Sequence, residues 1–198
     1  MKLRYSPTSP YVRKVMVLAK EAGLDRKIEA VTTNTTDPAL WGENPLGKVP
    51  AFVTDDGTVL FDSPVILEYL DSLHAGAKFI PPSGPQRWKA LTLEALADGI
   101  LDAALLRRGE SLRPQANQSA EFFAKQGQVI ERSLDVLEKD VASLNGPLTV
   151  GIITVGCALG YLDFRFAADA WRKGRPKLAA WYEAFSKRPS MASTAPPS

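Results

Sequence analysis

Apolar residues in the N-terminal part of the chain change their spacing repeatedly, which predicts short strands alternating with helices. Residues 2–5 form a short β-compatible run, and apolar side chains then recur every three or four positions from Val12 until Gly23 ends the pattern. Residues 28–31 can form a second strand. Residues 32–47 are polar and punctuated by proline and glycine, which indicates a loop that contains at most a short helix.

A hairpin and a further helix are predicted next. Two apolar runs, residues 49–54 and 58–61, flank the turn Asp55-Asp56-Gly57, and an Asp-Gly step between such runs favours a tight β-turn. Asp62-Ser63-Pro64 then begins a stretch with helical spacing. With the short helix included, the order is β-α-β-α-β-β-α, which predicts a small mixed sheet with helices packed on it.

Strand patterns largely disappear after the proline- and glycine-rich residues 76–86. The stretches with helical spacing that follow are residues 88–106, 122–144, 152–168 and 176–187. The predicted fold class is therefore α/β plus all-α. We expect an N-terminal α/β domain over residues 1–75, a linker over residues 76–86 and an all-helical domain over residues 87–198.

Composition excludes several classes of function. The 198 residues carry 24 Lys and Arg against 22 Asp and Glu, a net charge of +2, so we expect no nucleic-acid partner. Cys157 is the single cysteine and His74 the single histidine, so we expect no disulfide within the chain and no metal. No signal-peptide-like start and no run of roughly 18–20 apolar residues is found, and we expect a cytoplasmic protein with no membrane partner.

Three short segments could carry chemistry. Ser9 precedes Pro10 at a predicted helix start, where its hydroxyl lies beside unpaired backbone N–H groups that can hold an anion such as a thiolate. Taken alone, Ser9 is better explained as a plain N-cap, and the nearby hydroxyls of Tyr5, Ser6 and Thr8 compete for the role.

The second and third segments also have simple structural explanations. In Asn44–Pro50, a cis Val49-Pro50 bond would present the Val49 backbone to a ligand, whereas the alternative is a loop that enters an edge strand. Asp62 and Ser63 at a helix start can bind an ammonium and a carboxylate, whereas the alternative is a plain cap.

Taken in order, these segments resemble the cytosolic glutathione transferases. The matching stretches are residues 9–15, 44–50 and 62–70, followed by an all-helical half and by Arg188-Pro189-Ser190 near the last helix. The similarity covers essentially the whole chain and is greatest to a bacterial branch that includes the YibF-type proteins. It implies a thioredoxin-like domain followed by the all-helical C-terminal domain of that family.

The resemblance also implies roles in binding glutathione. Ser9 would donate a hydrogen bond to the glutathione sulfur and lower the pKa of the thiol. Val49 would pair through its backbone with the cysteinyl part, with Pro50 cis. Lys48 would meet the glycyl carboxylate, unless it is a solvated surface lysine.

Further implied contacts concern the glutamyl end and the electrophile. Asp62 and Ser63 would hold the γ-glutamyl end, although the family more often has glutamate at the position of Asp62. Another departure is Ile152, which occupies the acidic position of the family's capping box after Thr149. The residues expected to form the electrophile pocket, chiefly on the first long C-terminal helix, are Tyr11, Leu101, Ala104, Leu105 and Arg108.

Two functions follow from the resemblance. The first is an enzyme, a glutathione transferase that uses glutathione as co-substrate and conjugates or otherwise applies its thiolate to a small hydrophobic electrophile, as in detoxification. The alternative is a ligand-binding or protein-interaction module with little turnover. In either case the resemblance implies a homodimer. A serine hydrolase is disfavoured, because no Gly-x-Ser-x-Gly occurs and the one histidine, His74, lies at the far end of a different helix from Ser9.

Overall fold

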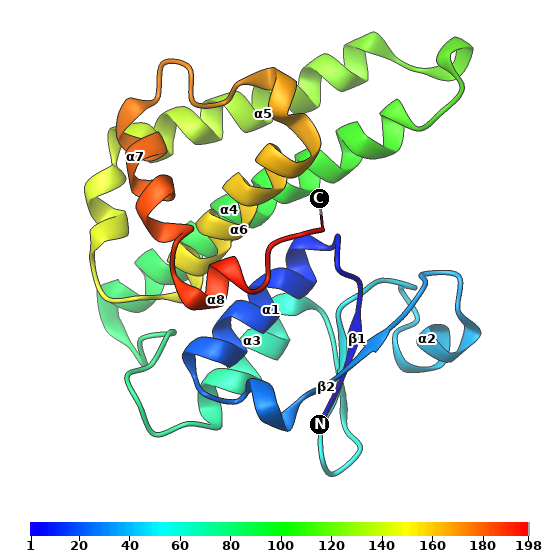
Figure 1. The fold of residues 1–198 in the computed structure, drawn as a ribbon, viewed down its shortest axis with the longest axis vertical. Coiled ribbons are helices and arrows are strands. Elements are labelled where there is room, and N and C mark those ends of the chain that lie inside the picture. Colours follow the sequence, from blue (N-terminus) through cyan, green and yellow to red (C-terminus); the bar gives the residue numbers. More distant parts are fainter. Residues whose placement is uncertain (198) are drawn as a thin grey trace. The chain divides into compact units, whose positions relative to one another are not determined.

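The computed structural model describes residues 1–197, and these residues form two compact units (Figure 1). Unit 1 contains residues 1–82 together with the segment from Pro189 onward, and unit 2 contains residues 83–188. Ser198, the last residue of the predicted helical domain, lies outside the described residues. The division into two domains joined by a linker at residues 76–86 stays a prediction.

Unit 1 contains a four-stranded mixed sheet in the order β2-β1-β3-β4. Strand β1 (Lys2–Tyr5) is parallel to β2 (Glu29–Thr32) and antiparallel to β3 (Ala51–Val53), which pairs in turn with antiparallel β4 (Val59–Leu60). Gly57 allows the tight turn between β3 and β4, because its φ of 86° is unfavourable for residues with a side chain. The predicted hairpin and mixed sheet are therefore confirmed.

The helices of unit 1 each begin with a proline in the first turn, where a missing N–H costs no intrahelical bond. They are α1 (Pro10–Glu21), the short α2 (Pro38–Glu43) and α3 (Ser63–Ser72). Apolar side chains of the sheet, α1 and α3 are fully buried and make the core, among them Leu3, Val15, Leu18, Phe52, Ile66 and Leu67. This arrangement confirms the predicted thioredoxin-like order β-α-β-α-β-β-α.

A fourth helix of unit 1 comes from the end of the chain. Helix α8 (Pro189–Ala192) packs against α1. The Arg13 guanidinium donates to the Met191 carbonyl at 3.0 Å, and the Ser190 hydroxyl donates to the Glu21 carboxylate. The sequence pattern placed this segment with the helical domain, whereas these contacts hold it beside α1.

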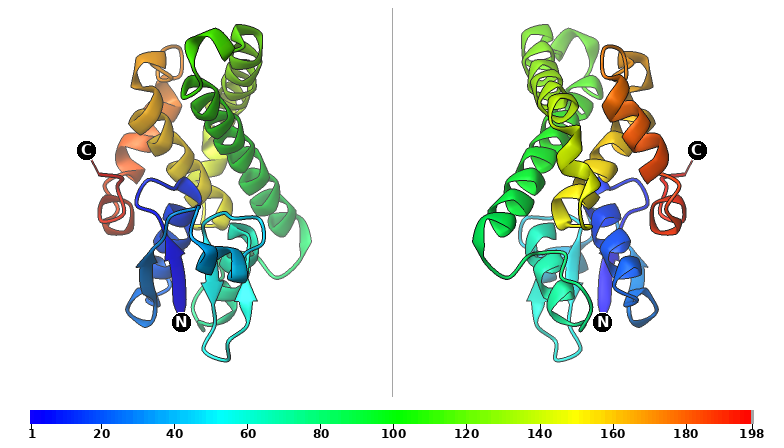
Figure 2. Two further views of the ribbon diagram at one scale, coloured as in Figure 1. Left: turned by 90° about the vertical axis from the view of Figure 1, so that its right-hand side faces the viewer. Right: turned by 90° about the vertical axis from the view of Figure 1, so that its left-hand side faces the viewer.

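Unit 2 is entirely helical, with α4 (Gly84–Ser111), α5 (Ala120–Lys139), α6 (Val150–Phe166) and α7 (Pro176–Phe185) as its main elements. Figure 2 shows α4 and α5 lying side by side, and α6 also packs along α4. The prediction of an all-helical unit is confirmed, although some helices begin or end at other residues than predicted. Helix α4 begins at Gly84, inside the predicted linker, because Pro85 fits the first turn.

Helix α5 is shorter than predicted. Its apolar spacing continues through Val141 and Leu144, but the helix ends at Lys139. Asp140 leaves the helical conformation, and its carbonyl accepts hydrogen bonds from both the backbone N–H and the hydroxyl of Ser143. A short 3-10 helix, residues Val141–Asn145, therefore replaces the last predicted turn.

Helix α6 forms the centre of unit 2. A Cβ on Gly151 would lie 2.6 Å from the Ala90 carbonyl oxygen and 2.7 Å from the Leu93 Cβ, so only glycine permits this close packing on α4. Thr149 caps the helix by accepting from the Ile152 N–H at 3.4 Å. By length and composition, the stretch Val150–Asp169 could cross a membrane, but 78% of its apolar window is buried inside the protein, as in the core helix of a folded domain.

Candidate functional site

The strand register in unit 1 brings the three predicted segments to one end of the sheet, where β1 and β4 finish and β3 begins. Arg4 of β1 lies opposite Ala51, and Phe52 lies opposite Leu60 of β4. Because β3 is antiparallel to both neighbours, its first residue lies beside the last residues of β1 and β4. The chain segments just beyond these strand ends carry Ser9, the Val49-Pro50 step and Ser63.

Ser9 is the N-cap of α1. Its Oγ accepts a hydrogen bond from the Val12 N–H at 3.3 Å, which leaves the hydroxyl proton available to a ligand. The side chain is half-buried. The competing hydroxyls of Ser6 and Thr8 lie 3.4 Å apart and can hydrogen-bond each other. Ser9 therefore combines a free O–H donor with the positive end of a helix dipole.

The Val49-Pro50 peptide bond is cis, as the resemblance implied. Within residues 1–197, neither the N–H nor the C=O of Val49 has a hydrogen-bond partner. A peptide-like ligand could pair with both groups as an additional strand would.

Asn44 holds the loop that leads to Val49. The side chain is 1% exposed, its Nδ2 donates to the Lys48 carbonyl at 2.8 Å, and its Oδ1 accepts from the Leu46 N–H at 3.0 Å. Gly47, with a φ of 62°, lets the loop turn and donates its N–H to the Asn44 carbonyl. The sequence pattern marked this loop, but it gave no indication that a buried amide clamps it.

Ser63 begins α3, with Asp62 as the preceding cap residue. Ser63 is 2% exposed, and its hydroxyl has no partner among the described residues. The backbone N–H groups of Ser63 and Val65 also lack acceptors there, and the exposed Asp62 carboxylate makes no capping bond. This helix start thus offers donors for a carboxylate, next to an acidic group that can attract an ammonium.

Glu43 fixes the short helix α2 to the sheet. Its carboxylate accepts from Arg4 Nε at 2.8 Å and Nη2 at 2.7 Å and from Lys2 Nζ at 2.6 Å. The hydrogen bonds from Arg4, and then that from Lys2, lower the pKa of Glu43 to about 2 even though burial opposes the change. Glu43 immediately precedes Asn44, so this ion pair anchors one end of the loop before Val49. No pattern in the sequence indicated this ion pair.

The remaining predicted site residues occupy varied environments. Lys48 is exposed and its ammonium has no ion-pair partner within the described chain, whereas Tyr11 on α1 is half-buried. On α4, Leu101 and Ala104 are fully buried, Leu105 is 36% exposed and Arg108 is half-buried. Their assignment to an electrophile pocket stays a prediction.

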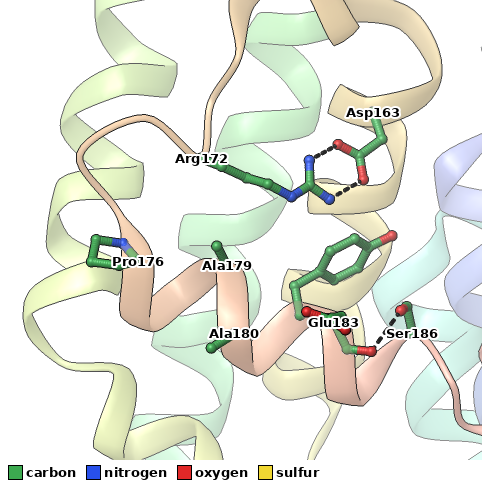
Figure 3. Close-up of a pocket in the computed structure, with 8 residues that line it drawn as sticks. Asp163, Arg172, Pro176, Ala179, Ala180, Glu183 and Ser186 are labelled. Atoms are coloured by element: carbon green, nitrogen blue, oxygen red, sulfur yellow. Dashed lines mark hydrogen bonds and ion pairs between the residues drawn. The ribbon is translucent and has the colours of Figure 1, made fainter.

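A cavity of about 580 Å³ lies in unit 2, among residues that the sequence did not single out (Figure 3). Arg172 binds Asp163 at 2.5 and 2.7 Å, the Glu183 carboxylate pairs with Lys187, and the Ser186 hydroxyl donates to the Glu183 carbonyl. The charged side chains that line this cavity are thus already paired. Among residues 1–197 no cluster of His, Cys, Asp and Glu suitable for a metal ion is found.

Comparison with known proteins gives consistent matches over nearly the whole chain. Residues 8–73 match the N-terminal domain of glutathione S-transferase, and residues 110–184 match its C-terminal domain. The uncharacterized GST-like protein YibF of Escherichia coli K12 is 39% identical, with 100% of this chain and 99% of YibF covered.

Solved structures agree with these matches. A glutathione transferase family member from Pseudomonas fluorescens Pf-5, crystallised with bound glutathione, is 47% identical and has a TM-score of 0.97, covering 100% of this chain and 99% of the other. A second structure of a Pf-5 family member, with bound S-(propanoic acid)-glutathione, is 46% identical, has a TM-score of 0.93 and covers 100% of both chains.

Proposed function

Because this chain belongs to the glutathione S-transferase family, we propose that unit 1 binds glutathione and that the protein transfers its thiolate to a small electrophile. The observation that carries the proposal is the unpartnered backbone of Val49, which offers one donor and one acceptor beside the cis proline. This pair matches the single N–H and C=O of a cysteinyl residue in an extended peptide.

The other contacts follow from the chemistry of the tripeptide. The Ser63 hydroxyl and the free N–H groups at the start of α3 bind the α-carboxylate of the γ-glutamyl end, and Asp62 attracts its ammonium. The exposed Lys48 ammonium meets the glycyl carboxylate. A relative that is 47% identical to this chain was crystallised with bound glutathione, which supports binding of this ligand.

The proposed role of Ser9 is to stabilise the thiolate form of bound glutathione. Its hydroxyl donates to the glutathione sulfur while its lone pair keeps the Val12 bond, and the N-terminus of α1 adds a favourable potential for a negative charge. Both effects favour the thiolate over the thiol. The thiolate then attacks the electrophilic carbon, a C–S bond forms, and the leaving group departs with the electron pair of the bond that breaks.

Calorimetric titration tests the binding part of the proposal. Glutathione and S-methylglutathione should both bind at millimolar concentration or below, because the backbone and carboxylate contacts do not need a free thiol. Absence of binding by either ligand would contradict the proposal. Binding of both ligands without turnover of a broad electrophile panel would instead indicate a binding module.

Assembly and location are part of the same proposal. We expect a homodimer in the cytoplasm, as the resemblance to the cytosolic glutathione transferases implies. Size-exclusion chromatography with light scattering should give twice the mass of the 21.5 kDa chain. A monomer at micromolar concentration would contradict the expected assembly and leave the glutathione contacts of unit 1 unaffected.

A further inference from the structure

The C-terminal end of α3 carries a buried aspartate that holds the chain segment after the helix. Asp71 is 5% exposed, and its Oδ1 and Oδ2 accept hydrogen bonds from the backbone N–H groups of Phe79 at 2.9 Å and of Ile80 at 3.1 Å. Both of these apolar residues are also buried. Residues 73–78 therefore form a loop whose two ends are joined by the Asp71 carboxylate.

Lys78 reinforces this loop through backbone carbonyl groups. Its ammonium donates to the carbonyl oxygen of Asp71 at 2.5 Å and to that of His74 at 2.6 Å, which satisfies two acceptors near the end of α3. Lys78 forms no ion pair with a carboxylate among residues 1–197. Neither the bonds that Lys78 donates nor those that Phe79 and Ile80 donate to Asp71 involve the imidazole of His74.

The imidazole of His74 packs against the same loop through both of its nitrogens. Its Nε2 lies 3.0 Å from Asp71 Oδ1, and its Nδ1 accepts the backbone N–H of Gly76 at 3.2 Å. The ring centre lies 5.3 Å from that of Phe79. Because a backbone N–H can only donate, Nδ1 carries no proton, and the proton of the neutral ring lies on Nε2, from which it is donated to Asp71.

Protonation of this ring affects its two hydrogen bonds in opposite ways. The bond from Nε2 to Asp71 becomes stronger, because its donor is then charged. Nδ1 gains a proton and can no longer accept, so two N–H donors face each other at Gly76. A Cβ built on Gly76 would lie 3.2 Å from Nδ1, which shows how closely the turn contacts the ring. In the described part of the chain, Asp71 and Lys78 are the charged residues in contact with His74.

We infer that His74 is a pH-sensitive switch for the turn after α3. The neutral imidazole holds the Gly76 amide, and the protonated imidazole releases it while Asp71 keeps its bonds to Phe79 and Ile80. Imidazole is the side chain that ordinarily changes charge between pH 5 and 8, and His74 is the single histidine of the chain. Acidification thus changes the path of residues 75–77, before the chain continues into unit 2 at residue 83, and leaves α3 folded. This inference does not depend on glutathione binding.

Nuclear magnetic resonance of the isotope-labelled protein tests the switch. Between pH 8 and pH 5, the amide resonances of Gly76 should shift with the same midpoint as the ring resonances of His74. The hydrogen-exchange protection factor of Gly76, corrected for the intrinsic pH dependence of exchange, should fall about fivefold across that midpoint, because one hydrogen bond is lost. The amides of Phe79 and Ile80 are the internal control and should stay protected.

Two variants separate the charge of the ring from its packing. His74→Phe keeps an aromatic ring beside Phe79 but has no nitrogen, so the Gly76 amide should show, at every pH, the low protection that the unaltered protein reaches when acidified. His74→Asn offers an amide oxygen that does not titrate, so Gly76 should be independent of pH. The Thr36 amide, which donates to the Asn34 side chain at 3.1 Å, is the matched control within each protein and should not respond.

Several results would overturn the inference. One is a Gly76 amide that stays protected while the His74 ring titrates, and another is a His74 ring that stays neutral down to pH 5. A Gly76 response that persists in His74→Phe would assign the effect to a different group. Loss of protection at Phe79 and Ile80 with the same midpoint would show that the whole loop unfolds, which contradicts a switch confined to the turn.

Discussion

Arg4 holds the Glu43 carboxylate through two hydrogen bonds, at 2.8 Å from Nε and 2.7 Å from Nη2. The residues are 39 positions apart, and the pair joins β1, one of the two central strands of the sheet, to the helix that precedes the Val49 loop. Because the bond is bidentate and mostly shielded from solvent, it stabilises the fold more than an exposed ion pair does.

Glu43→Gln should lower the free energy of unfolding by about 2 kcal/mol at neutral pH. The folded-state pKa of about 2 lies below the ordinary 4.5, so the contribution of Glu43 is complete above pH 4.5 and is lost as the pH falls toward 2. Urea unfolding of both proteins across this range should show the difference shrinking. Glu183→Gln, which breaks an exposed pair with Lys187, should change stability by less than about 0.5 kcal/mol.

Ser9→Ala should raise the pKa of the bound glutathione thiol, because the hydroxyl donor to the sulfur is removed. Thiolate absorbance as a function of pH measures this pKa. Loss of the cap to Val12 also costs about 1 kcal/mol of stability. Ser119→Ala removes an equivalent cap from the start of α5, where the hydroxyl accepts from the Phe122 N–H at 3.1 Å, and should leave the thiol pKa unchanged. An unchanged pKa in Ser9→Ala would remove Ser9 from its proposed role.

Asn44→Ala should weaken glutathione binding about tenfold, because the loop carrying Val49 loses its buried clamp. Asn44→Asp keeps the acceptor for the Leu46 N–H but removes the donor to the Lys48 carbonyl, and it should also weaken binding. Titration calorimetry measures both. Asn34→Ala removes an exposed turn-forming amide and should have no effect on affinity. Equal affinities of all three variants would contradict the importance of the clamp.

Gly151→Ala should destabilise the protein by about 1–3 kcal/mol, because the added Cβ would collide with the Ala90 carbonyl and with Leu93. Gly99→Ala is the matched control. It also lies within a helix, but its Cβ would meet no atom within 4 Å, so the higher helix propensity of alanine should stabilise the protein by about 0.5–1 kcal/mol. Denaturant unfolding of the two variants should therefore shift in opposite directions.

Much of the fold was predictable, because its elements carry local patterns. The Asp55-Asp56-Gly57 turn predicted the hairpin, and proline residues after Ser9 and Asp62 marked two helix starts. Local patterns failed where a helix ended against its own periodicity, as α5 does before Val141. They also failed for α8, whose four residues are too few to show a period.

The candidate site was predictable only in part. Ser9, Val49 and Ser63 stand out because caps and prolines have recognisable neighbours in the sequence. The Arg4–Glu43 pair and the Asn44 clamp do not stand out, since their importance depends on burial and on partners that come together only in the folded chain. Similarly, no pattern distinguishes Arg107 from Arg108, yet one is paired with an acid and the other has no partner among residues 1–197.

The short hairpin between β3 and β4 has a consequence for how the sequence can vary. Val49 precedes one arm and Ser63 follows the other, so the number of residues between them sets the separation of the groups proposed to bind the cysteinyl and γ-glutamyl parts of glutathione. An insertion at Gly57 that slipped the pairing by one residue would move Ser63 along the strand and turn neighbouring side chains to the opposite face. The length of the hairpin therefore fixes the spacing between the two proposed binding segments.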